Sequence, residues 1–246
     1  MRKLKASFNL LLTRLLPVTF ALLIFLGSSL SVPVKADTLP VPFEKTHQLV
    51  LNGGFKIIGN SIITCDENST GSGAFPAHCE AARDFAPNLP QGVARNNYQF
   101  MKQIDIDNDA ATFNSSSAKL NLPNGATVEY ARLFWSYGGS QSYNQSPLVG
   151  KVKFKAAGGQ YKEVTSEKLN QLAPTNNGNN SQYSAEVTDL VKGNGAKEYF
   201  TANIQVGDLT QKAQFAGWGM YVVYKDPSAP KRLVTLFDGI AYEDNA

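Results

Sequence analysis

Most of the chain alternates apolar and polar residues with a period of two, which is the pattern of a β-strand with one buried face. Residues 151–155 show it most simply, because lysines occupy every second position and Val152 and Phe154 lie between them. Residues 118–122 repeat the pattern, and the Pro-Asn-Gly sequence at residues 123–125 predicts a turn after them. These segments are therefore expected to be strands that turn one face to a core.

Three segments are apolar on both faces, and this predicts central strands at residues 126–137, 215–224 and 233–237. Shorter segments predict the other strands, at residues 48–51, 55–58, 61–65, 98–107, 161–165, 183–187 and 199–206. Only residues 188–192, which end at Gly193, favour a helical turn. About a dozen short strands separated by Gly, Asn and Pro predict an all-β fold, a β-sandwich of the jelly-roll type.

No internal repeat is visible, so residues 37–246 are interpreted as a single domain that is long enough to bury a sizeable core. Two stretches inside it predict loops. Residues 65–96 are rich in Pro and Ala, and residues 173–181 form a polar segment with no apolar anchor.

The N-terminus predicts a signal peptide over residues 1–36. A basic start is followed by an apolar run at residues 15–32, and Val34 and Ala36 supply the small residues that cleavage after Ala36 requires. The alternative is a signal anchor that stays in the membrane, because the run is about long enough to span a bilayer. No later segment is apolar for long enough to span a bilayer. We therefore expect a secreted or cell-surface protein, whose contact with a membrane would need an anchor not present in this chain.

The formal net charge of +3 is carried by this leader, which holds five cations and no acid. Residues 37–246 have 18 Lys and Arg against 20 Asp and Glu. Nucleic-acid binding needs concentrated Lys and Arg, so a nucleic-acid partner is not expected.

The two cysteines, Cys65 and Cys79, fit an exported protein and predict a disulfide that pins the loop at residues 65–96. Closing it is worth about 3 kcal/mol in a chain-entropy estimate. The alternatives are two free thiols, or a metal pair with His78. A zinc site would need a fourth ligand.

Three acids alternate at Asp105, Asp107 and Asp109, where carboxylates on one side of a strand would repel unless a cation lay among them. They are a candidate calcium site, although Ala110 and Ser116 replace the glycine and glutamate of a helix-loop-helix calcium loop. The alternative is a solvated strand end. No other cofactor is expected.

Candidate catalytic residues are few, and no catalytic residue is predicted. The only histidines, His47 and His78, are interpreted as ordinary polar residues. Glu129 and Glu186 lie on predicted strands and form the one carboxylate pair that a β-sandwich glycanase would use.

Aromatic residues suggest a ligand platform instead. Trp135, Tyr137, Tyr143 and Trp218 stand near Asn and Gln, as in sites that stack sugar rings. The alternative is that the tryptophans and Phe134 fill the sandwich core.

Several segments together resemble a known family: residues 51–55 (LNGGF), 58–61 (IGNS), 64–66 (TCD), 96–98 (NNY), 104–107 (IDID), 112–118 (TFNSSSA), 122–126 (LPNGA), 133–135 (LFW), 215–218 (FAGW), 222–227 (VVYKDP) and 236–239 (LFDG). They resemble, over most of residues 50–240, the N-terminal β-sandwich domain of large bacterial adhesin-like surface proteins that carry repeats of the domain of unknown function number eleven. Members of that family run on past the last strand. The resemblance therefore implies the front piece of a longer protein, or a truncated relative with an open strand edge.

The sequence thus predicts a non-enzymatic module for adhesion or structural display. Its expected partner is a protein or glycan on a host or neighbouring cell. A calcium-assisted carbohydrate-binding module is the alternative, and a glycanase is the third hypothesis.

Overall fold

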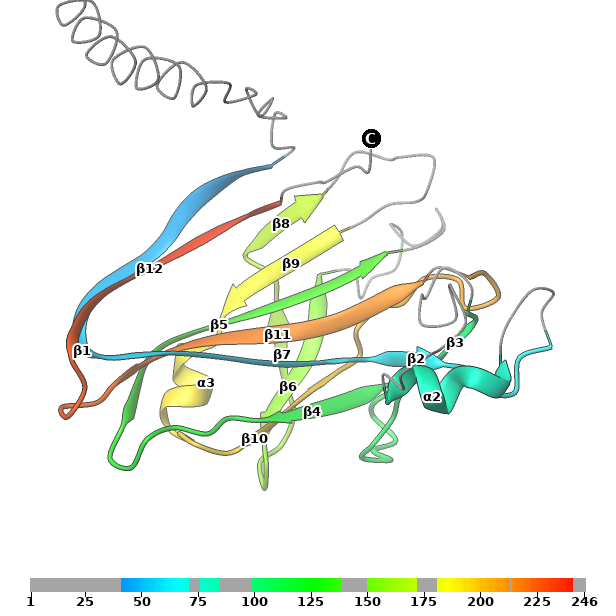
Figure 1. Cartoon of the computed structure of the whole chain (residues 1–246), viewed down its shortest axis with the longest axis horizontal. Coiled ribbons are helices and arrows are strands. Elements are labelled where there is room, and N and C mark those ends of the chain that lie inside the picture. Colours follow the sequence, from blue (N-terminus) through cyan, green and yellow to red (C-terminus); the bar gives the residue numbers. More distant parts are fainter. Residues whose placement is uncertain are drawn as a thin grey trace, which may run out of the picture. The chain divides into compact units, whose positions relative to one another are not determined.

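The alternating segments pair into antiparallel sheets, which confirms the all-β fold (Figure 1). The computed structural model describes residues 41–70, 76–84, 99–138, 150–171, 181–212 and 214–240. All of these lie in one compact unit. The predicted signal peptide at residues 1–36 and most of the polar loop at residues 173–181 lie outside the described residues.

The larger sheet has six strands in the order β12-β1-β11-β5-β9-β8. Their bounds are Lys231–Ile240 (β12), Val41–Ser61 (β1), Phe215–Lys225 (β11), Thr127–Gly138 (β5), Ser181–Glu186 (β9) and Lys168–Gln171 (β8). The second sheet has four strands in the order β4-β10-β6-β7. They span Ser115–Lys119 (β4), Glu198–Ala202 (β10), Lys151–Ala156 (β6) and Lys162–Thr165 (β7). A small third sheet pairs β2 (Ile63–Cys65) with β3 (Met101–Gln103).

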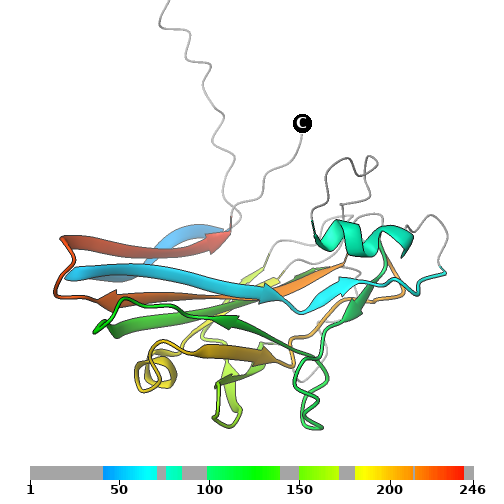
Figure 2. The same cartoon turned by 60° about the horizontal axis from the view of Figure 1, so that its bottom comes forward.

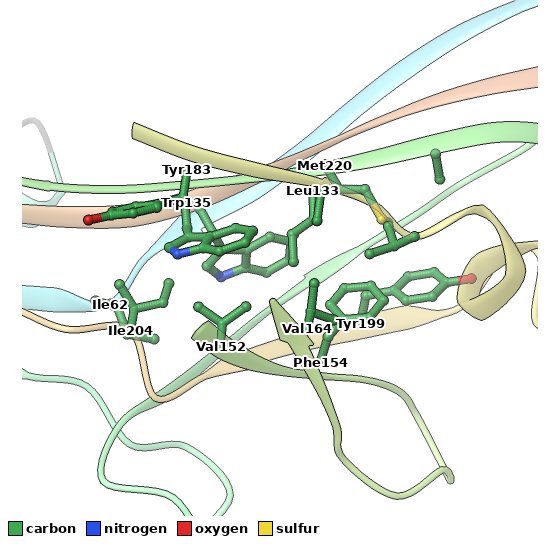
Figure 3. Close-up of a cluster of buried hydrophobic side chains, with 14 of the residues drawn as sticks. Ile62, Leu133, Trp135, Val152, Phe154, Val164, Tyr183, Tyr199, Ile204 and Met220 are labelled. Atoms are coloured by element: carbon green, nitrogen blue, oxygen red, sulfur yellow. The ribbon is translucent and has the colours of Figure 1, made fainter. Parts of the chain in front are cut away.

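The main core lies between the two large sheets (Figure 3). From the six-stranded sheet, β5 contributes Leu133 and Trp135, and β11 contributes Met220. From the other sheet, Phe154 of β6 stacks on Tyr199 of β10, with ring centroids 5.6 Å apart. Alternation along each strand therefore gives a two-layer sandwich, with one face of each large sheet buried against the other.

Strand β1 is long and bends at Gly53. Its first half pairs with β12 and its second half pairs with β11. Gly53 has a φ of 156°, and a Cβ there would lie 2.0 Å from the carbonyl oxygen of Tyr224, so no other residue fits. Two separate strands were predicted here, at residues 48–51 and 55–58. The structure joins them, because the Gly53 backbone allows the chain to bend without leaving the ladder.

We call residues 41–52 of β1 together with β12 the flap. The sheet face that it covers, opposite the sandwich core, is the outer face (Figure 2). Leu49, Leu51, Val234 and Leu236 of the flap pack with residues of β5 and β11 in a second, smaller cluster. His47 stacks on Tyr130 of β5 with ring centroids 3.8 Å apart.

Two strand predictions need correction. Residues 233–237 were expected to form a central strand, but β12 ends the strand order of the sheet, with Leu233 and Phe237 59% and 53% exposed. Residues 98–107 were expected to form one strand. Only β3 does so, because Ile106 and Asp107 donate their backbone N–H groups to the Ser115 side chain rather than to a ladder.

The loop at residues 65–96 is pinned as predicted, since Cys65 and Cys79 form a disulfide. Its described part contains a short 3-10 helix, Pro76–His78 (η1), and a one-turn α-helix, Cys79–Arg83 (α2). The predicted helical turn is α3, Thr188–Lys192. None of the helices among the described residues has the length and apolar character needed to cross a membrane.

Candidate functional site

The outer face carries a groove of about 360 Å³ in the part of the sheet near the flap. Residues that pair directly across strands share one face of a sheet, so the register gives its layout. The outer-face residues of β1, β11, β5 and β9 form two rows: Gly59, Gly219, Phe134 and Ser184, then Ser61, Gly217, Ser136 and Gln182. Phe215 follows on β11, opposite Gly138.

Gly217 and Gly219 line the groove without side chains, and Gly59 lies beside Gly219 on β1. The fold requires glycine at some of these three positions and not at others. A Cβ at Gly59 would lie 2.3 Å from the Trp218 carbonyl oxygen, and one at Gly217 would lie 3.0 Å from the Asn60 carbonyl oxygen. At Gly219 the nearest atom would be 3.6 Å away, which is ordinary contact. The backbone approach of β1 and β11 therefore explains Gly59 and Gly217 but not Gly219.

The described residues that line the groove include no Asp, Glu, His, Lys, Arg or Cys. Phenyl rings of Phe134 and Phe215 supply apolar surface, and Phe215 is 39% exposed. The Ser61 hydroxyl faces two backbone carbonyl oxygens, of Ile63 at 2.6 Å and Ala216 at 3.1 Å. A serine hydroxyl used in this way, with no base beside it, is not an activated nucleophile.

A buried polar network borders the groove and fastens the flap. Arg132 of β5 and Asp238 of β12 are 6% and 1% exposed, and the Arg132 Nε lies 3.6 Å from Asp238 Oδ2. Ser184 donates its hydroxyl to the same carboxylate oxygen at 2.7 Å, and Arg132 also pairs with Glu167 at 3.0 Å. Arg132 therefore interrupts an otherwise apolar strand because it forms ion pairs inside the fold.

Gln182 links the network to the groove, because its Nε2 donates to Asp238 Oδ1 at 3.4 Å while its side chain lines the groove wall. On the flap side, Lys168 of β8 pairs with Glu44 at 3.1 Å and donates to the Asp238 carbonyl oxygen at 3.2 Å. The charges beside the groove are thus held in pairs.

The three candidate calcium ligands are held by the protein itself. Asp107 receives the Ser115 hydroxyl at 3.0 Å, the Tyr161 hydroxyl, and the Lys155 ammonium at 3.2 Å. Ser115 also lies 2.7 Å from Asp105. The described residues contain no group of three or more His, Cys, Asp or Glu side chains that could hold a metal. Lys155 therefore supplies positive charge to Asp107, and a calcium site at Asp105, Asp107 and Asp109 stays a prediction.

Electrostatics agree with this arrangement. Burial raises the pKa of Asp107, but hydrogen bonds from Tyr161, the Asp109 backbone, Ser115 and Lys155 outweigh it and hold that pKa well below its usual value. Burial, and then the hydrogen bond to Asp107, raise the pKa of the Tyr161 hydroxyl. Asp107 is therefore a structural carboxylate joining the segment before β4 to Lys155 of β6.

The aromatic residues predicted as a ligand platform belong to the sandwich core, where Trp135, Tyr137 and Trp218 are 2%, 4% and 6% exposed. Trp135 and Trp218 are nevertheless among the residues that line the groove. The indole N–H of Trp218 donates to Ser116 at 2.9 Å. Tyr143 lies outside the described residues.

The alternative, in which the tryptophans and Phe134 fill the core, holds for both tryptophans but not for Phe134, which lies on the outer face. Phe215 and Gly219 were missed. The two-residue period of residues 215–224 predicts that Phe215 and Gly219 share one face of the strand. The local sequence does not show which of the two faces lies outside the core.

The remaining candidates lie away from the groove. His47 packs on Tyr130, and His78 ends η1 beside the disulfide. Glu129 is the extra residue of a bulge, since its neighbours Val128 and Tyr130 pair with Tyr224 and Val223. Glu186 lines a separate hollow of about 410 Å³ with Glu167 and Asp189.

Comparison with known protein families gives a match over the second half of the chain and part of the first. A family model described as "Protein of unknown function (DUF3344)" matches residues 94–240, more than half of the chain. No curated protein and no solved structure matches.

Proposed function

The chain belongs to the DUF3344 family of proteins of unknown function, and from that premise we propose that it is an exported, non-enzymatic β-sandwich module for adhesion. It binds a partner on a host or neighbouring cell through the outer-face groove. It serves as the N-terminal part of a larger surface protein, as its resemblance to adhesin-like domains implies.

One observation carries this proposal: the described lining of the groove is concave and partly apolar, and it contains no titratable side chain. General acid–base catalysis needs a group that exchanges protons near neutral pH, and nucleophilic catalysis needs an activated nucleophile. A groove lined by phenyl rings, amides and hydroxyls can hold a ligand but has no means to cleave it. The groove therefore favours binding of a ligand over its cleavage.

Export is supported by the disulfide between Cys65 and Cys79, because disulfides persist in oxidising compartments. The basic and apolar leader at residues 1–36 supports it independently. Adhesion also suits the architecture, since a rigid sandwich with a fastened flap positions a binding face without moving parts.

The test begins with expression of the full chain in a secreting bacterial host. We expect an exported product cleaved after Ala36, measured by intact mass. Beads coated with that product should resist shear on lawns of bacterial or epithelial cells at least about tenfold better than albumin-coated beads. Retention equal to that of albumin-coated beads on every lawn would overturn the adhesion role, and a product retained inside the cell would overturn export.

A further inference from the structure

We propose that the outer-face groove binds an uncharged saccharide, and that Gly219 is the position whose missing side chain keeps its floor open. This inference rests on the proposed binding function and names the chemical class of its ligand. Phe134 and Phe215 would face the apolar side of the sugar ring, and Ser136 and Gln182 would meet its hydroxyl groups.

The charge of the groove selects the class. No cationic side chain lines its described part, so a phosphate, sulfate or carboxylate group would lose its hydration without a partner. Arg132, a buried cation on the same strand as Phe134 and Ser136, is already paired with Glu167 and Asp238. An ammonium ligand would equally lack a carboxylate, because Asp238 is engaged by Ser184 and Arg132. The ligand that fits is therefore neutral.

The mixture of side chains narrows the class further. A sugar ring has C–H groups on its faces and hydroxyl groups around its rim, so it needs apolar surface and amide or hydroxyl partners within one site. Phe134 stands in one row of the groove, and Ser136 and Gln182 stand in the next. Phe215 follows on β11 with 39% of its surface exposed. A wholly apolar ligand would leave the amide and hydroxyl groups without partners.

The glycine at position 219 indicates that the open floor of the groove serves binding rather than folding. Glycine in a strand interior weakens the strand, because it adds backbone freedom and no packing. A Cβ there would meet only the Ile58 carbonyl oxygen, at 3.6 Å, so alanine fits the backbone. The fold gains nothing from glycine at this position, whereas a flat ligand gains direct access to the sheet.

The experiment measures binding of the full exported chain to an array of neutral and acidic oligosaccharides, followed by calorimetry with the best neutral one. Gly219→Ala and Gly219→Val raise the floor in two steps. Phe215→Ser removes a ring, and Phe113→Ser is the matched control, because Phe113 is 40% exposed and outside the described groove lining.

We expect neutral saccharides to bind and acidic ones not to bind, with no change on adding a chelator. Gly219→Val should weaken binding by at least about tenfold and Phe215→Ser by at least about fivefold, while Phe113→Ser changes it less than about twofold. The thermal midpoint of Gly219→Ala should equal or exceed that of the wild type.

Three results would overturn the inference: no neutral saccharide bound at millimolar concentration, capture of apolar peptides instead, or saccharide binding that both Gly219 variants leave intact. Bead adhesion separates this failure from failure of the proposed function. Beads that still adhere without any saccharide affinity refute the ligand class alone. Beads that do not adhere refute the adhesion role.

Discussion

Replacing Asp238 by asparagine should release the flap, because it removes the charge that holds Arg132 while keeping the size of the side chain. The Asp238 side chain has no exposed surface, and the Arg132 side chain is 8% exposed, so water cannot solvate either charge if its partner is removed. The Ser184 hydroxyl can still bond to an asparagine oxygen. The loss is therefore mainly the uncompensated guanidinium.

The size of the effect follows from what remains around Arg132. Breaking a buried ion pair by removing one partner costs about 3–5 kcal/mol. Arg132 keeps Glu167 at 3.0 Å, but the side chain of that glutamate is 55% exposed, so solvent screens part of its attraction. We therefore expect Asp238→Asn to lower the free energy of unfolding by about 3 kcal/mol.

Urea unfolding measures this loss, and amide hydrogen exchange locates it. Exchange should accelerate in residues 41–52 and in β12, because the flap opens before the sandwich does. Glu44→Gln is the matched control. Its carboxylate also pairs across the flap but is 73% exposed, so its loss should stay within about 0.5 kcal/mol.

A double variant, Arg132→Met with Asp238→Leu, removes both charges and should recover most of the loss. A cost for Asp238→Asn below about 0.5 kcal/mol, or flap amides that exchange at the wild-type rate, would refute the claim that this pair fastens the flap.

Three further predictions test the packing and the charges. Leu236→Ala should cost about 2–3 kcal/mol in urea unfolding, whereas Leu233→Ala on the same strand should cost less than about 0.5, because the first side chain is 8% exposed and the second 59%; equal losses would contradict the orientation of the flap. The folded-state pKa of Asp107 lies below its unfolded value, so the stability that the ionised carboxylate contributes is present above about pH 4 and is lost as the pH falls. Asp107→Asn should therefore lower the free energy of unfolding at pH 7 and make it depend less on pH in acid. A pH dependence equal to that of the wild type would argue against the pairing with Lys155. Replacing Cys65 and Cys79 by serine should cost about 3 kcal/mol, and wild-type protein that is equally stable with and without reductant would contradict this.

Much of the fold can be predicted from the sequence, because strand periodicity is a local property. The alternation of residues 151–155 became β6, in which Val152 and Phe154 are 1% exposed. The turn at residues 188–192 became α3, and the two cysteines paired. The strand and the helical turn depend on residues that are neighbours along the chain. The disulfide follows because the chain has only two cysteines.

The tertiary structure alone decided which face of each strand is buried and which residues meet. Period two puts Phe134 and Trp135 on opposite faces of β5, but only packing against β6 and β10 makes the Trp135 face the core. Leu233 and Phe237 look like residues of a central strand and are exposed, because β12 has a single partner among the described strands.

The groove and the flap could not be predicted for the same reason. Ser184 and Asp238 are 54 residues apart in the chain, yet they share a hydrogen bond within the network that fastens the flap. Gly219 matters only because the register places it between Gly59 and Phe134. Strand order and register are set by contacts between distant segments, and no local pattern records those contacts.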